Sequence, residues 1–273
     1  MKRTLLAAFA ILTVSAAYAS SLSELAFDNG TIQGAGPRTG ANGYNFANVE
    51  GTNNGNFASY VIVDFNGTQT MSGVTGIADG TYGGTFNFGG AVTANSLSLR
   101  LTQDNAGFTH DGALQFWLAT ANTSGTSNHS GSTPNFADGA SEFSPLLLGS
   151  GTFTQGATTP VTGTGAPTAL GSGTIDTYTF SLSGAAQTAV SDALNNGTAI
   201  RLIISPNDPT VAATYAGFSV YSTANTSDWT PPYNDPNTWR PQLTIDASPV
   251  PEPASLAVIG LGLLGLMRRR SRK

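Results

Sequence analysis

The sequence predicts an all-β fold, a single antiparallel β-sandwich or jelly roll with one short helix. Short runs rich in β-branched and aromatic residues recur along the chain, and segments rich in Gly and Asn separate them. No repeat of fixed period is present, which disfavours a propeller or a β-helix. The composition agrees, because only 10% of the 273 residues are charged while 33 are glycine.

The strands follow from local patterns. Residues 59–65 are rich in β-formers and end at the turn signal Asn66-Gly67. Residues 81–88 space their aromatic side chains evenly, and residues 96–101 alternate leucine with serine or arginine, as expected of a strand with one buried face. Further strands are expected at 113–119, 176–182, 199–204, 216–221 and 241–245.

One segment differs from this β pattern. Residues 185–194 favour a short helix that ends at Asn195-Asn196-Gly197. The Gly/Ser/Thr-rich stretches 122–132 and 149–173 are interpreted as surface loops, because a division there would leave fragments with too few strands. We therefore expect one body domain, residues 20–248.

The N-terminal residues have the pattern of a secretory signal peptide, residues 1–19. Lys2 and Arg3 precede an apolar stretch at 5–14, and Ala17 and Ala19 offer small residues for cleavage after Ala19. A retained membrane anchor is the alternative, although the apolar stretch is short for a span.

Residues 249–273 form a second targeting segment with three parts. Pro251 and Pro253 hold Val250-Pro251-Glu252-Pro253 extended and outside any helix. The uncharged run 254–267 can enter a bilayer as a transmembrane helix. The basic residues that follow keep that end on the cytoplasmic side; they are Arg268, Arg269, Arg270, Arg272 and Lys273.

This order resembles the PEP-CTERM sorting signal. The resemblance implies export through the inner membrane, a transient anchor there, and processing by an exosortase-like membrane enzyme. It places the mature protein in the cell envelope or extracellular matrix, linked to extracellular polysaccharide. A permanent anchor is the alternative, but the run is shorter than the roughly 20 residues of a full span. The body, at residues 27–51 and 240–245, resembles jelly-roll cargo of such proteins.

Charge and cysteine content exclude several classes. Between the targeting segments the chain has four arginines, no lysine and fifteen acidic residues, a net charge of −11. Such a surface repels phosphate, so nucleic acid is not an expected partner. No cysteine occurs, which excludes thiol catalysis and thiolate metal sites.

We expect no enzymatic activity and no cofactor. Gly-x-Ser-x-Gly, His-Glu-x-x-His and P-loop motifs are absent. The third hypothesis for the function is a secreted glycan hydrolase, whose paired acid and base would come from the best local cluster, Asp104, Asn105, His110 and Asp111. A turn before a strand explains the same residues.

A structural calcium ion is one further hypothesis. First and last strands often lie side by side in jelly rolls, so Glu24 or Asp28 would meet Asp246 and supply carboxylate ligands. Surface turns are the alternative explanation.

A carbohydrate-binding module is the alternative function. Trp229, Tyr233 and Trp239 lie in a Pro-rich segment and could stack on sugar rings. The competing interpretation is that these rings plug one end of the sandwich. The preferred function is an exported, non-enzymatic envelope or matrix protein that is sorted through residues 249–273.

Overall fold

The computed structural model describes residues 19–33, 36–38, 41–53, 58–74, 77, 79–104, 109–121, 143–156, 174–218 and 239–250. These residues are mostly β, with antiparallel sheets and two helices, which confirms the predicted class. The signal residues 1–18 and the apolar run 254–267 lie outside this part of the chain. Within it, no helix has the length and hydropathy needed to cross a bilayer.

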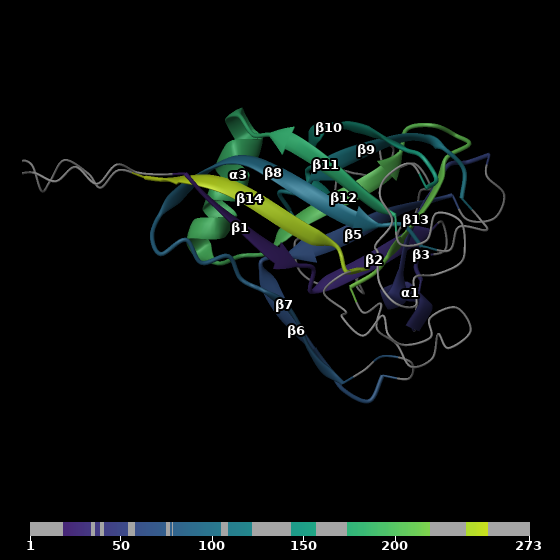
Figure 1. Cartoon of the computed structure of the whole chain (residues 1–273), viewed down its shortest axis with the longest axis horizontal. Coiled ribbons are helices and arrows are strands. Elements are labelled where there is room, and N and C mark those ends of the chain that lie inside the picture. Colours follow the sequence, from purple (N-terminus) through teal and green to yellow (C-terminus); the bar gives the residue numbers. More distant parts are fainter. Residues whose placement is uncertain are drawn as a thin grey trace, which may run out of the picture.

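The smaller sheet has four strands. Its order is β1 (Ser20–Leu25), β14 (Gln242–Pro249), β8 (Val92–Thr102) and β11 (Ile175–Ser181). All three pairings are antiparallel. The first and last strands are thus hydrogen-bonded neighbours, as expected for a jelly roll (Figure 1).

The larger sheet has eight strands. Six follow in the order β10 (Leu146–Phe153), β9 (Gly112–Leu118), β12 (Ile200–Pro206), β5 (Ser59–Phe65), β2 (Asp28–Gln33) and β3 (Gly36–Pro37). The other two are β4 (Phe46–Glu50) and β13 (Ala212–Ala216), which pair with each other, and β4 also pairs with β5. A separate hairpin, β6 (Gly67–Met71) and β7 (Gly80–Gly84), projects from the sandwich (Figure 1).

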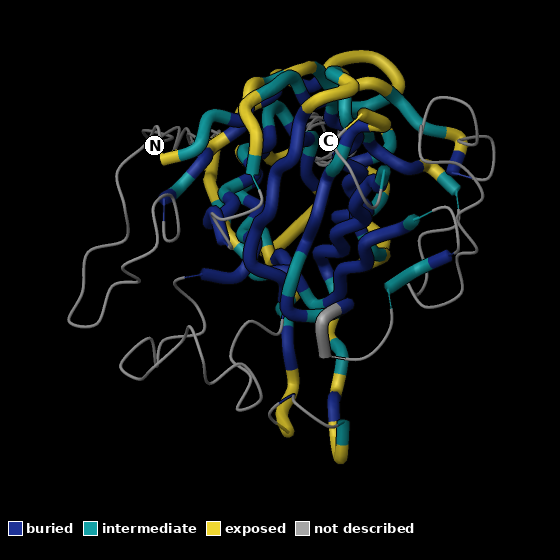
Figure 2. The backbone as a smooth tube through the Cα atoms, turned by 90° about the vertical axis from the view of Figure 1, so that its right-hand side faces the viewer, coloured by how far each residue is buried: buried dark blue, intermediate teal, exposed yellow. Residues whose placement is uncertain are grey.

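The two sheets pack face to face because their strands alternate. Leu97 and Leu99 of β8 are fully buried between the sheets, as are Val61 and Val63 of β5. Phe116 of β9 reaches across to the aromatic rings of β11. The strands therefore form the buried centre of the described body, and its exposed residues lie mostly at turns and at the β6–β7 hairpin (Figure 2).

Most predicted elements are confirmed, with corrections at their ends. The predicted helix is α3 (Gly184–Asn196), which ends at Gly197 in the left-handed conformation. The predicted strand 216–221 is wrong in its described part, because β13 ends at Ala216. The predicted strand 81–88 is β7, which ends at Gly84. The start of the predicted loop 149–173 belongs to β10.

A buried ion pair lies on the face of the larger sheet that points away from the main core. Arg201 of β12 is directly opposite Asp64 of β5, and both side chains are fully buried. Arg201 Nε and Nη2 donate to the two carboxylate oxygens at 2.7 and 2.6 Å. Asp28 of β2 lies opposite Asp64 on the other side, so three charged residues form a row across the sheet.

Burial dominates the titration of this pair. Removal from water raises the pKa of Asp64 to about 6, although the hydrogen bonds and the charge of Arg201 lower it. The charge of Asp28 raises it further. At neutral pH the carboxylate is ionised and depends on Arg201.

Replacing Arg201 with methionine should destabilise the protein strongly. Arg201→Met leaves the Asp64 carboxylate buried without its partner, which costs about 3–5 kcal/mol of unfolding free energy. Urea unfolding at pH 7 measures this loss. Arg100→Met is the control, because it makes the same change at a half-buried arginine of β8, and it should lower the unfolding free energy by less. Equal losses in the two variants would contradict a special role of the pair.

The pair should also give stability a defined pH dependence. The pKa of Asp64 rises from 3.8 to about 6 on folding, so the folded state holds this proton more tightly. The resulting contribution is fully present below about pH 4 and is lost as the pH rises through about 6. Relative to Asp64→Asn, the wild type should gain roughly 1–3 kcal/mol between pH 7 and pH 4. Urea unfolding of both proteins at a series of pH values tests this; a constant difference would refute it.

Candidate functional site

The predicted sorting segment starts inside the last strand of the body. Pro249 is still part of β14 and lies opposite Val92 of β8. The backbone N–H of Val250 donates to the carbonyl oxygen of Ala91 at 2.9 Å. Val250 is 44% exposed and is the last residue that the structure describes. Pro251, Glu252, Pro253 and the basic residues from Arg268 to Lys273 lie outside the described part of the chain.

Helix α3 holds the start of β8 with a stripe of polar side chains. Gln187 Nε2 donates to the carbonyl of Ala94, and the Ala94 N–H donates to Ser191 Oγ, both at 2.9 Å. Asn195 accepts from the N–H of Val92 at 2.9 Å and donates to its carbonyl at 3.0 Å. These side chains take the place of a neighbouring strand, because the pairing with β11 ends at Ser96.

The match between the helix and the strand is geometric. The three stripe residues are four positions apart, which is about 6 Å along an α-helix. Alternate residues of a strand are about 6.6 Å apart. A stripe at this spacing therefore meets Val92 and Ala94 in turn, while Val190 and Leu194 of the same helix are buried in the core. The base of the sorting segment is thus held by β8, which is held by α3.

The beginning of the body lies beside its end. Ser20, the first residue of β1, is opposite Ala247 of β14. The predicted cleavage site after Ala19 is therefore adjacent to the predicted sorting segment, at one end of the smaller sheet (Figure 1). Ala17 lies outside the described residues.

The structure does not bring together the three predicted calcium ligands. Glu24 is opposite buried Leu243, whereas Asp246 alternates to the exposed face of β14. Directly paired residues share a face, so Glu24 and Asp246 lie on opposite faces of the sheet. Asp28 belongs to the other sheet. Within the described residues, no group of three acidic or histidine side chains is placed to hold a metal ion.

Two of the predicted calcium ligands, Asp246 and Glu24, contact other residues of the body. Asp246 accepts a hydrogen bond from Ser96 Oγ at 2.8 Å. The Glu24 carboxylate lies where a Cβ on Gly84 would be, and burial raises its pKa.

One of the three predicted sugar-binding rings is buried. Trp239 is 2% exposed, so its ring has no free face for a sugar. For this ring the prediction of a sugar contact is wrong, and the competing interpretation of a plug fits. Trp229 and Tyr233 lie outside the described residues.

The described members of the candidate catalytic cluster make structural contacts within the body. Asp111 accepts the backbone N–H of Gln155 at 2.9 Å. His110 forms an antiparallel bridge with Ala212, and Asp104 is 3% exposed. Asn105 is not described.

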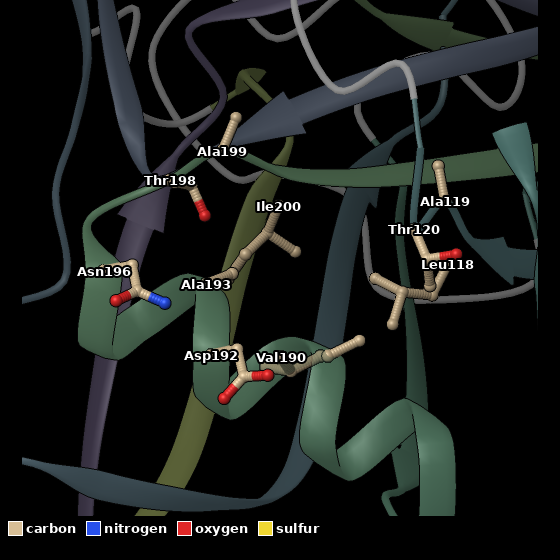
Figure 3. Close-up of a pocket in the computed structure, with 11 residues that line it drawn as sticks. Leu118, Ala119, Thr120, Val190, Asp192, Ala193, Asn196, Thr198, Ala199 and Ile200 are labelled. Atoms are coloured by element: carbon tan, nitrogen blue, oxygen red, sulfur yellow. The ribbon is translucent and has the colours of Figure 1, made fainter.

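A pocket that the sequence analysis did not anticipate lies between α3 and the ends of β9 and β12. Its volume is about 280 Å³. Val190, Leu118 and Ile200 contribute apolar side chains, and Asp192 and Asn196 stand at its helical side (Figure 3). Among the described residues that line it, Asp192 is the one with an ionisable side chain.

Removing the last member of the polar stripe should loosen the end of β8. Asn195→Ala deletes both hydrogen bonds to Val92, at a cost of about 1–2 kcal/mol. Hydrogen exchange at the Val92 amide should accelerate accordingly. Asn196→Ala is the matched control, because it makes the same change in helix propensity at the next position. Unchanged exchange in Asn195→Ala would show that the stripe does not hold the strand.

Comparison with known proteins identifies the terminal segment and not the body. No curated protein matches the chain. Residues 249–273 match the family model of the PEP-CTERM protein-sorting motif, the segment that continues β14. The chain therefore carries a PEP-CTERM sorting motif, which implies an exported protein that an exosortase processes.

Proposed function

We propose that the protein is a non-enzymatic component of the cell envelope or extracellular matrix and is linked to extracellular polysaccharide after processing. One observation carries the proposal: the last strand of the body ends at Pro249, where the matched motif begins. None of the described strands of the body extends past Pro249, so the body's last described strand ends where the matched signal starts.

Each part of the terminal segments has a place in this route. The signal peptide starts export and is removed after Ala19. The apolar run 254–267 then lodges in the inner membrane, and the basic residues stay on the cytoplasmic side. This arrangement holds Val250 to Pro253 at the outer face of the membrane, where the exosortase cleaves or transfers the chain.

The surroundings of the polar residues support a role without catalysis. A hydrolase would need convergent carboxylates in a cleft. Asp111 instead fixes the turn at Gln155, and among the described residues that line the pocket beside α3 only Asp192 has a carboxylate. The chemistry of this protein is then chemistry performed on it.

Loss of the two motif prolines should stop processing. In Pro251→Ala/Pro253→Ala the segment is no longer held extended, so the precursor should accumulate in the inner-membrane fraction with its basic end intact. Intact mass spectrometry of the membrane and extracellular fractions measures this. Pro231→Ala/Pro232→Ala is the matched control and should be processed normally. Extracellular wild-type protein that retains Arg268–Lys273 would refute processing.

Cells that make no extracellular polysaccharide test the link itself. The processed protein should then move from the matrix fraction to the medium, because its attachment point is missing. Immunoblots of both fractions, with and without the exosortase, separate processing from retention. An unchanged matrix fraction would refute the link while leaving processing in place.

A further inference from the structure

The sorting motif leaves the folded body with almost no intervening chain. The backbone N–H of Val250 donates to the carbonyl oxygen of Ala91, which directly precedes β8, and Pro251 is the next residue. An extended chain advances at most about 3.6 Å per residue, so residues 251–253 reach only about 11 Å from Val250.

This reach is smaller than the body. A compact domain of about 230 residues has a radius of gyration of about 17 Å. An enzyme that holds residues 251–253 therefore lies against the part of the body from which the motif emerges. We call this part the exit face and define it as residues 19–21, 87–91 and 247–250, which adjoin the two ends of the body.

The exit face differs in charge from the rest of the molecule. Its three segments contain no charged residue, although the body as a whole has a net charge of −11. The exposed Asp246, which is paired with Ser21, lies at its border. Gly89, Gly90 and Ala91 are exposed and small. A surface of small, uncharged residues lets a partner approach closely without removing water from an ionised group.

The exit face is also held in place. Val250 is bonded to Ala91, and Asn95 Nδ2 donates to Ser248 Oγ at 2.8 Å. The polar stripe of α3 fixes the neighbouring Val92 and Ala94. A surface that is ordered before binding loses little conformational entropy when it binds.

We infer that the exit face is a docking surface for the exosortase, which binds the folded body together with the motif. This inference rests on the proposed processing of residues 250–253. The short reach of residues 251–253 from Val250 brings the enzyme to this face, and the uncharged segments of the face accommodate it. The body is then part of the substrate.

Gly90→Glu places a charge on the exit face without disturbing the fold. A Cβ at Gly90 would have no heavy atom within 4 Å, and the backbone there is outside the left-handed region. Gly80→Glu is the matched control, since its Cβ is equally free and it lies in the projecting hairpin. Pulse-chase analysis should show processing about tenfold slower for Gly90→Glu and unchanged for Gly80→Glu. Equal rates for wild type and Gly90→Glu would overturn the docking surface.

A linker tests whether the effect acts through proximity. About ten Gly and Ser residues between Pro249 and Val250 uncouple the body from the motif and leave Val250 to Pro253 intact. With the linker, Gly90→Glu and wild-type chains should be processed at the same rate, slower than the unlinked wild type. A linker that accelerates the wild type would show that the body obstructs the enzyme, which contradicts docking.

A crosslink tests whether the folded end of β14 is what docks. Val92 and Pro249 are directly paired, and the chain has no cysteine of its own. Val92→Cys/Pro249→Cys therefore permits one disulfide. Processing should be as fast in the oxidised form as in the reduced form. A block on oxidation would show that β14 must detach, and would overturn the inference.

Purified exosortase in vesicles separates the enzyme from the lipid. In uncharged phosphatidylcholine vesicles, Gly90→Glu should still be processed slowly. A defect that requires anionic lipid would assign the face to the membrane and overturn the inference. If the wild type is processed neither in phosphatidylcholine vesicles nor in vesicles that contain anionic lipid, the proposed function fails. If the wild type and Gly90→Glu are processed at equal rates, the docking surface alone fails.

Discussion

The antiparallel pairing of β14 between β1 and β8 is the constraint on which the rest depends. Leu243, Ile245 and Ala247 of β14 are fully buried, so this strand supplies one wall of the core. The partners of β14 include the first strand of the body, which lies over two hundred residues earlier. Sheet pairing of such separated segments forms only when both are available. The smaller sheet is therefore completed by the strand that leads into the sorting motif, so the motif follows a finished fold.

The backbone N–H and C=O groups of β8 find hydrogen-bond partners in two different ways. From Ser96 onward, β11 pairs with it as an ordinary strand. Before that point Gln187, Ser191 and Asn195 of α3 provide donors and acceptors from side chains. A helix offers this only when its polar residues recur every four positions, because that spacing approximates two residues of a strand. This use of helix side chains in place of a strand matters for function because it includes Val92, which lies opposite the last residue of β14.

The sequence predicts what depends on neighbours along the chain and misses what depends on pairing. Leu97, Leu99 and Leu101 alternate clearly, and they lie in β8. β13 escapes notice because its Ala-rich residues resemble no strand pattern, although they are buried against β4. The calcium hypothesis places the right strands side by side, but the register sends Glu24 and Asp246 to opposite faces. The burial of Trp239 likewise depends on packing that no local pattern encodes.

The distribution of charge gives the sorting route a direction. Five basic residues follow the apolar run, whereas the body has a net charge of −11. In the proposed route, the basic end favours the cytoplasmic leaflet before processing and would hold the chain in the membrane. Processing would remove that end, and the acidic body that remains would be repelled by anionic lipid. Neutral sugars exert no such repulsion. In the proposed route, one cleavage would convert a membrane-retained chain into one that leaves the membrane for the matrix, and the exit face would be the part of the body in close contact with the enzyme until then.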